Sequence, residues 1–262
     1  MEVSRKTRLW AAGILFPMAM AGAASAASVQ VTITNEQEDD GIFLTPLVSL
    51  FHNGSYDAFD TGGSASASIE ALAEGGDGAG LIADAEAAGA TGGVVLGPDG
   101  FAGAPVIDPG ETASAVFSVD STAGRYFSYF SMVIPSNDLF IGTENPMANE
   151  IFDSVGNFLG TTIQVYSTAV WDGGTEENDN LGAAFNTAGG TATDTDGPVV
   201  PVGSLFFLSG EGTAAGTTLD LAAGRTLVAT INVSQVPVPA AAPLLLAGLG
   251  GLAALRRRKR KA

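Results

Sequence analysis

The stretch SVQVTITN, residues 28–35, alternates apolar and polar side chains without a break. Successive side chains of an extended strand point to opposite faces of a sheet, so one set can be buried while the other meets solvent. The set on the buried face is Val29, Val31 and Ile33, and the set on the open face is Gln30, Thr32 and Thr34. The stretch therefore predicts a half-buried β-strand.

The same alternation returns at intervals along the chain. It is clearest in TIQVYSTAVW (162–171) and TLVATINV (226–233), and further strand candidates are ASAVFSV (113–119), YFSYFSMVI (126–134) and GSLFFLS (203–209). Proline and glycine separate these segments, as turns require. Many short strands with irregular spacers predict an all-β fold, an antiparallel β-sandwich with long loops.

Two stretches have helical features instead. SASIEALAEG, residues 66–75, begins with a serine in the N-cap position and ends with a glycine, and AGLIADAEAAGA, residues 79–90, is a second candidate. The remaining Gly- and Ala-rich sequence between about Gly75 and Gly103 is expected to be loop. We find no internal repeat and no linker, so the body is expected to be one domain.

The charge of the chain is distributed very unevenly. Only two arginines, Arg125 and Arg225, stand against 27 acidic residues between Ala27 and Leu255, which makes the net charge of this body −25 at pH 7. Such a surface repels phosphate backbones, so nucleic-acid binding is excluded, and it attracts cations. The chain has no cysteine, which excludes disulfides and thiolate metal sites.

Both ends of the chain look like targeting signals. Residues 1–26 combine a basic start, an apolar run and the small residues Ala24-Ser25-Ala26, which are the three parts of a secretory signal peptide with cleavage before Ala27. At the other end, an uncharged apolar run from Ala240 to Leu255 precedes six basic residues. As a helix this run is about 24 Å long, and flanking arginines can extend its reach across a membrane core of ~30 Å.

The C-terminal segment resembles the VPxPA variety of PEP-CTERM sorting signals. The residues that match the motif are Val236, Pro237, Val238, Pro239 and Ala240, with Val238 where leucine is commoner. The resemblance implies a Gram-negative bacterium, export across the inner membrane, transient anchoring by the hydrophobic helix, and processing by an exosortase. A plain C-terminal membrane anchor is the alternative. The expected domain limits are 1–26, 27–235 and 236–262.

Three pieces of the body resemble the N-terminal domain of spondins, which are extracellular matrix proteins. The first piece contains Asn35, FLTP (43–46), FHNGS (51–55), Phe59-Asp60 and LAE (72–74); the second contains Ser131-Met132, PSND (135–138) and Ile141-Gly142; the third is WDGGTE (171–176). They occur in the family's order and span most of residues 27–235. The resemblance implies an eight-stranded, C2-like antiparallel sandwich.

The resemblance also implies a calcium site shared between two loops. Its ligands would be Asp138 from PSND, and Asp172 and Glu176 from WDGGTE, with Glu176 where the family has the shorter Asp. Calcium takes six to eight oxygen ligands, and three carboxylates packed together repel one another without a cation. Glu177 or Asp179 could replace Glu176. From spacing alone, Asp138 would instead cap a turn and the acidic run would be solvated.

No motif in the body points to an enzyme. His52 is the only histidine, no recognisable nucleophile motif accompanies it, and we expect it to pack or hydrogen-bond at a strand end. TDTDG, residues 193–197, lacks the pattern of an EF-hand loop and is expected to be a turn before a strand. We therefore expect a secreted, non-enzymatic surface or matrix protein with an unknown surface ligand. The alternatives are an extracellular hydrolase with paired carboxylates, or a structural envelope protein without a metal.

Overall fold

The structure is a computed structural model that describes residues 26–98, 101 and 103–236. The predicted signal peptide and sorting segment lie outside the described residues, apart from Ala26 and Val236. Within the described part of the chain, no helix is long and apolar enough to span a membrane.

Four of the predicted strand segments supply a four-stranded antiparallel sheet. Its order is β5 (Thr112–Val119), β1 (Ala27–Asn35), β11 (Leu227–Gln235) and β8 (Thr161–Tyr166). The predicted strand TIQVYSTAVW contributes to it only up to Tyr166, because a 3-10 turn over Ser167–Ala169 separates this part from Val170–Asp172, which joins the other sheet. In the middle of the four-stranded sheet Val31 lies opposite Ala115 on one side and Val233 on the other. Strand β1 follows the predicted burial from residue 29 to residue 34: the apolar Val29, Val31 and Ile33 are buried, and the polar side chains between them are half-buried.

A second sheet has seven strands, also paired antiparallel. Its order is β10 (Val200–Pro201), β9 (Val170–Asp172), β7 (Leu139–Gly142), β6 (Tyr126–Ile134), β3 (Leu47–His52) and β4 (Thr91–Val95), and β2 (Phe43–Leu44) also pairs with β6. The described residues thus contain eleven strands, so the expected count of eight is wrong. Two of the eleven, β2 and β10, have only two residues each.

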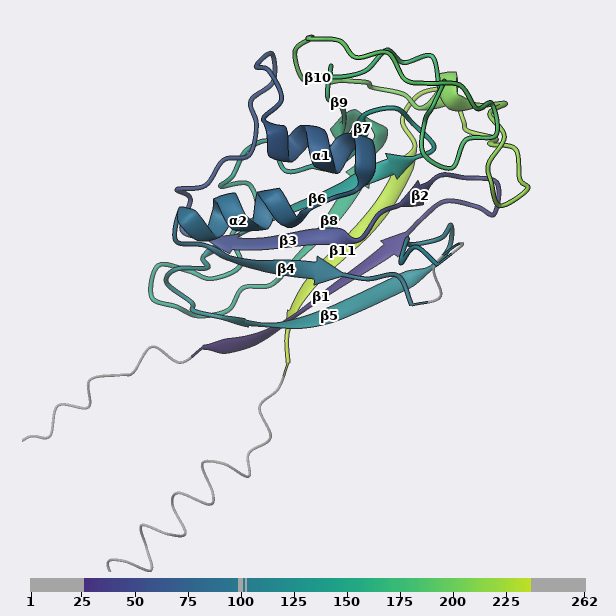
Figure 1. The fold of residues 1–262 in the computed structure, drawn as a ribbon. Coiled ribbons are helices and arrows are strands. Elements are labelled where there is room, and N and C mark those ends of the chain that lie inside the picture. Colours follow the sequence, from purple (N-terminus) through teal and green to yellow (C-terminus); the bar gives the residue numbers. More distant parts are fainter. Residues whose placement is uncertain (1–25, 99–100, 102, 237–262) are drawn as a thin grey trace, which may run out of the picture.

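Two helices cover the outer face of the seven-stranded sheet (Figure 1). They are α1 (Ala67–Gly75) and α2 (Ala79–Ala87), at the predicted places. The Ser66 hydroxyl accepts a hydrogen bond from the Ile69 N–H at 3.2 Å, and Gly76 ends α1 in the left-handed conformation. The Ser66 N-cap is therefore as predicted, whereas the glycine that ends the helix is Gly76, one residue beyond the predicted stop at Gly75.

Two further sequence predictions about segments are wrong. The stretch from Gly75 to Gly103 contains β4 as well as α2, although glycine is generally unfavourable in strands. A Cβ on Gly92 would lie 2.5 Å from Leu50 Cδ2, so glycine is what allows β4 to approach β3. GSLFFLS forms a 3-10 turn over Phe206–Leu208 instead of a strand, with Phe206 55% exposed.

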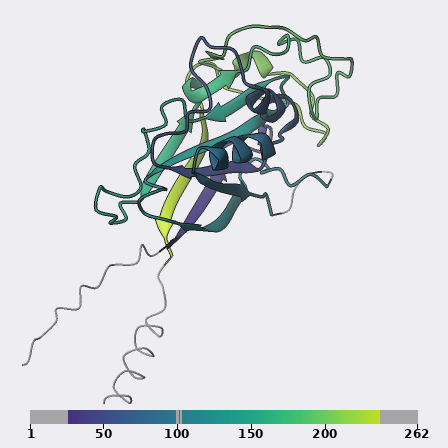
Figure 2. The ribbon, with the colours of Figure 1, turned by 60° about the vertical axis from the view of Figure 1, so that its left-hand side comes forward.

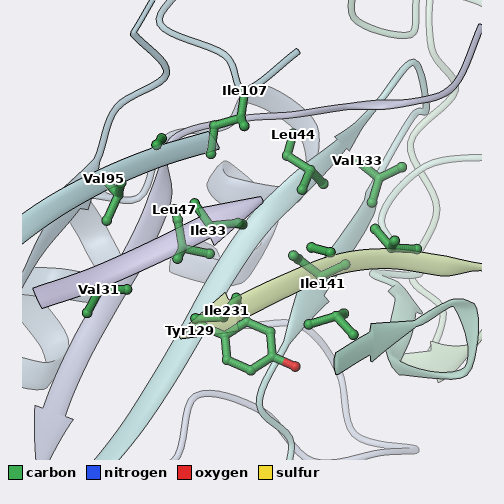
Figure 3. Packing of buried hydrophobic residues seen from close by; sticks show 14 of the residues in the cluster. Val31, Ile33, Leu44, Leu47, Val95, Ile107, Tyr129, Val133, Ile141 and Ile231 are labelled. Carbon is green, nitrogen blue, oxygen red and sulfur yellow. The ribbon is translucent and has the colours of Figure 1, made fainter. Parts of the chain in front are cut away.

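The two sheets pack face to face over the main core, as Figure 3 shows from close by. Val31, Ile33 and Ile231 from the four-stranded sheet meet side chains such as Tyr129 and Ile141 from the other. A second core lies between the seven-stranded sheet and the helices. Val48, Leu50 and Phe130, from alternate positions of the same central strands, pack there against helix residues, which are Ile69, Leu72 and Leu81. Strand β3 is buried at all six positions because both of its faces are covered.

The two ends of the described chain lie side by side in both views (Figure 1, Figure 2). Val29 pairs with Gln235, and the Val236 N–H donates to the Ser28 carbonyl at 2.8 Å. The long loops between β9 and β11 lie at the opposite end of the domain (Figure 1). The two ends of the described chain therefore lie away from these loops.

His52 is buried at the end of β3, where the sequence analysis expected it to form hydrogen bonds. Its Nδ1 accepts from the Gly54 N–H at 3.1 Å, which puts the ring proton on Nε2, 2.9 Å from the Ser128 hydroxyl. Burial lowers the pKa of His52 to about 4. The neutral ring is therefore part of the folded state, and protonation opposes folding.

This burial makes the stability of the domain depend on pH. In the unfolded chain His52 is protonated near its ordinary pKa of about 6.5, whereas in the folded protein it stays neutral down to about pH 4. The neutral ring therefore makes its full contribution to the free energy of unfolding above pH 6.5, and this contribution falls as the pH drops toward 4. At pH 5 the loss is about 2 kcal/mol in the free energy of unfolding. In urea titrations, His52→Gln should be less stable than the wild type at pH 7, and that difference should shrink by this amount at pH 5. Parallel pH profiles for the two proteins would show that His52 does not titrate as described.

Candidate metal centre

The turn between β6 and β7 places Asp138 against the loop that follows β9. Asp138 is fully buried, and its Oδ2 accepts hydrogen bonds from the Thr175 N–H at 2.8 Å and the Glu176 N–H at 3.1 Å. The Thr175 hydroxyl is 3.3 Å from the same oxygen, and the Asp138 carbonyl accepts from the Gly173 N–H at 3.0 Å. Two loops that are far apart in the sequence are thus joined through one aspartate.

Asp138 does not cap its own turn. The Ser136 hydroxyl does so by accepting from the Leu139 N–H at 3.1 Å. The carboxylate of Asp138 is therefore left for the remote loop, and the alternative derived from spacing alone is wrong for this residue.

The two glycines of WDGGTE make this approach possible. A Cβ on Gly173 would lie 3.2 Å from the Asp138 carbonyl oxygen and 3.3 Å from its Oδ2. Gly174 has a φ of +70°, and a Cβ there would lie 2.7 Å from the backbone of Gly197. A side chain at position 173 would crowd Asp138, and one at position 174 would crowd the backbone of residues 197 and 198 that packs on this loop.

The second carboxylate oxygen of Asp138 has no partner. Among the described residues, Oδ1 is buried and makes no hydrogen bond. Burial is the main cause that raises the pKa of Asp138 and the charge of Asp172 adds to it, while the hydrogen bonds from Glu176 and Thr175 act in the opposite direction. A buried oxygen with negative charge and no donor is a costly arrangement that a bound cation would relieve.

Asp172 ends β9 beside Asp138, and the structure brings these two predicted residues together. Its Oδ1 accepts from the Gly174 N–H at 2.7 Å, and its Oδ2 accepts from the Asn178 side chain at 2.6 Å. The residue is half-buried. The carboxylate is therefore held in one orientation by its own loop while it remains within electrostatic reach of Asp138.

Glu176 is placed differently from the other two. Its backbone N–H binds Asp138, but its carboxylate is 3.4 Å from the Asn137 side-chain amide. Burial raises the pKa of Glu176 most, and the charges of Glu74 and Asp138 raise it further. Within the described part of the chain, no group of three or more His, Asp or Glu side chains is gathered tightly enough to hold a metal ion by itself.

The acidic residues that follow on the same loop face solvent. Glu177 and Asp179 are exposed, and the Asp179 carboxylate accepts from the Leu181 N–H at 3.0 Å within its own turn. The segment 193–197 runs antiparallel beside WDGGTE, with Thr195 and Gly197 donating backbone hydrogen bonds to it, so the predicted turn is wrong, although the segment does precede β10. The backbone of Glu176 forms an isolated β-bridge with that of Asp194, so another acidic residue lies beside Glu176.

Sequence reasoning missed the residue that closes the loop. Asn137 is buried, its amide donates to the Leu181 carbonyl at 3.1 Å, and its side-chain oxygen accepts from the Asn180 N–H at 2.8 Å. Asn180 is in the left-handed conformation, with a φ of 60°. The only signal in the sequence was that Asn137 stands next to Asp138.

Replacing the buried charge should stabilise the protein when no metal is present. Because the pKa of Asp138 is raised, its ionisation opposes folding at pH 7 and this penalty disappears as the pH falls. Asp138→Asn keeps an acceptor for Thr175 and Glu176 and removes the charge, so in EDTA at pH 7 it should melt higher by roughly 2–4 °C, or about 1 kcal/mol. The advantage should vanish at low pH. A lower melting temperature for the variant in EDTA at pH 7 would contradict this account of the charge.

The comparison with known families covers the segment that contains both loops. The family model Spondin_N matches residues 40–190, which include β2 to β9, both helices and all three predicted ligands. No curated protein matches the chain. The chain belongs to the spondin N-terminal domain family.

Proposed function

We propose that this protein is an exported, non-enzymatic cell-surface or extracellular-matrix protein whose spondin-type domain binds calcium between the β6–β7 turn and the loop after β9. The observation that carries the calcium proposal is the buried Oδ1 of Asp138, which has no hydrogen-bond partner among the described residues. An adhesive or biofilm role follows from the family and from the sorting-signal resemblance.

The donor set fits calcium better than a transition metal. The residues at this junction offer carboxylate, amide, hydroxyl and backbone oxygens, and the described part of the chain contains one histidine, which lies elsewhere. Hard oxygen ligands of this kind suit Ca²⁺, which accepts irregular and flexible coordination. The body charge of −25 also favours the approach of a divalent cation.

Asp138, Asp172 and Glu176 would hold the ion. Asp138 is supported as a ligand by its Oδ1, which has no hydrogen-bond partner among the described residues. Asp172 is supported as a ligand by the interaction of its charge with Asp138. Glu176 has weaker support as a ligand because its carboxylate contacts the Asn137 amide. Its charge nevertheless interacts with that of Asp138. When bound, calcium would neutralise these carboxylates and fix the two loops to each other.

The burial of Asp138 favours a structural role over catalysis. A carboxylate with a raised pKa is a candidate general acid only where a substrate can reach it. Asp138 is 0% exposed and its Oδ2 is occupied by donors from Thr175 and Glu176. A hydrolase that uses paired carboxylates therefore has less support, and a structural envelope protein without a metal is the remaining alternative.

The position of the chain ends supports the proposed topology. Both ends of the described chain leave the domain together, away from the loops between β9 and β11 (Figure 1). An anchor attached after Val236 would therefore leave these loops facing away from the membrane. That arrangement suits a domain that presents its loops at the cell surface.

Calcium should raise the melting temperature of the protein. A ligand specific for the native state stabilises it by about 2.7 kcal/mol at 100 times its Kd, which corresponds to roughly 5–10 °C for a domain of this size. We expect a Kd of about 10⁻⁴–10⁻³ M, which is common in extracellular modules. Thermal melts in EDTA and in calcium, together with calorimetric titration, measure both quantities.

The matched control for these melts is on the same loop. Asp138→Asn and Asp172→Asn should lose the calcium-induced shift, whereas Glu177→Gln, which removes an exposed carboxylate, should keep it. Identical melts of the wild type in EDTA and calcium would end the metal proposal.

Export and processing can be followed in cells of the native host. Antibody against the domain should detect it in envelope or extracellular fractions, with the N-terminus at Ala27 and without the basic end. Replacing Pro237 and Pro239 by alanine should leave the unprocessed chain in the membrane. Recovery of the intact 262-residue chain from the cytosol would contradict the proposed localisation.

A further inference from the structure

The outward face of the four-stranded sheet has no charged side chain. Strands β5, β1, β11 and β8 together contain 32 residues and not one Asp, Glu, Lys or Arg. The rest of the body is acidic enough to carry a net charge of −25. Edge strands in particular are usually protected by charge, most often lysine, and β5 and β8 at the edges of this sheet lack it.

Hydroxyl and amide groups cover this outward face, which we call the polar face. It consists of the outward-pointing alternate side chains of the four strands, which are serine, threonine, asparagine and glutamine except for Val116 and Tyr166. Its central row crosses all four strands as Ser114, Thr32, Asn232 and Thr162. The helices pack on the other sheet, and the central row is exposed or half-buried.

The groups of the polar face are spaced by the sheet itself. Neighbouring strands are about 4.8 Å apart, and same-face residues along a strand are about 7 Å apart. Some side chains already support one another, since the Asn232 amide donates to the Thr162 hydroxyl at 2.9 Å and the Thr34 and Thr112 hydroxyls are 2.9 Å apart. The result is an ordered array in which hydroxyls and amides both donate and accept.

A shallow depression lies at one corner of the polar face. It has a volume of about 450 Å³ and is lined by residues 158–162 and 232–235. Asn232, Ser234 and Thr162 provide its polar side, while Leu159, which is 55% exposed, and Phe158 add apolar surface. Polar groups beside apolar surface can bind a ring that has both hydroxyls and C–H groups.

From this arrangement we propose that the polar face binds an uncharged polysaccharide chain, seated across the central row and in the depression beside Leu159. Neutral hydroxyl and amide groups cost far less to remove from water than charged groups, so they can be covered by a ligand that replaces their hydrogen bonds. The acidic surroundings repel anionic polymers and leave neutral ones unaffected. Because a four-stranded sheet is twisted, its surface matches a single flexible polysaccharide chain better than the flat surface of a crystalline polysaccharide.

The cation nearest the polar face lies at its edge and outside the central row. Arg225 stacks on the Tyr166 ring at its edge, with the guanidinium carbon 3.6 Å from the ring centre. The central row therefore contains no cation for an acidic sugar, and Arg225 covers one face of the Tyr166 ring. Recognition depends on the neutral hydroxyl and amide groups and on the depression.

Native affinity electrophoresis tests the proposal on the full chain in mild detergent. Gels containing hydroxyethyl cellulose, galactomannan or dextran provide neutral polymers, and gels containing alginate provide an anionic one. We expect at least one neutral polymer to retard the protein and alginate not to retard it. EDTA should leave the retardation unchanged, so this outcome is separate from that of the calcium proposal.

Isosteric variants locate the binding surface. Thr32→Val/Thr162→Val removes two hydroxyls from the central row without changing side-chain shape and should weaken retardation about tenfold. Thr191→Val/Thr193→Val removes two exposed hydroxyls from a loop and should have no effect. Asn232→Asp places a negative charge in the central row and should abolish retardation. Asn53→Asp makes the same change in charge at an exposed turn and should leave retardation unchanged.

Three results would overturn the proposal. The first is no retardation by any neutral polymer, and the second is equal retardation of the wild type and both polar-face variants. The third is retardation by alginate alone. Self-association that the polar-face variants abolish, without any polysaccharide effect, would show that a second copy of the chain occupies this face instead.

Discussion

Burial of the central strands on both faces is the constraint on which the rest of the structure depends. Strand β3 is buried at every position and β6 at all but its first, so each requires cover on two sides. The four-stranded sheet supplies one cover and the two helices supply the other, which gives three layers. The outer face of the four-stranded sheet then needs no cover. The turn that follows β6 is itself buried, and Asp138 lies in it.

The same architecture explains why the candidate metal centre is strained electrostatically. Asp138 joins two loops through its Oδ2, but the position that makes those hydrogen bonds possible also removes its Oδ1 from water. Negative charge from Asp172 increases the cost. A cation at this point would convert an unfavourable contact between loops into a favourable one, which is why calcium is proposed to control loop order and not chemistry.

Alternation in the sequence predicted the strands of the four-stranded sheet because one face of each is open to solvent. It did not predict LVSLFH as β3 or LFIG as β7, since a strand buried on both faces has no alternation to detect. The glycine-rich β4 was missed because Gly92 packs closely against Leu50 and Gly93 against Phe117, which only the folded arrangement shows. Asp138, Asp172 and Glu176 came from the family resemblance, whereas Asn137, Glu74 and Asp194 join them through tertiary contacts that no local pattern encodes.

Terbium luminescence gives the most direct test of a cation at Asp138. Tb³⁺ replaces calcium at oxygen sites, and Trp171, which directly precedes Asp172, can sensitise its emission. The account predicts emission that saturates, is displaced by calcium, and is lost in both Asp138→Asn and Trp171→Phe, while Glu177→Gln retains it. Emission that persists unchanged in Asp138→Asn, or that calcium does not displace, would contradict the assignment of Asp138 as the residue that a cation completes.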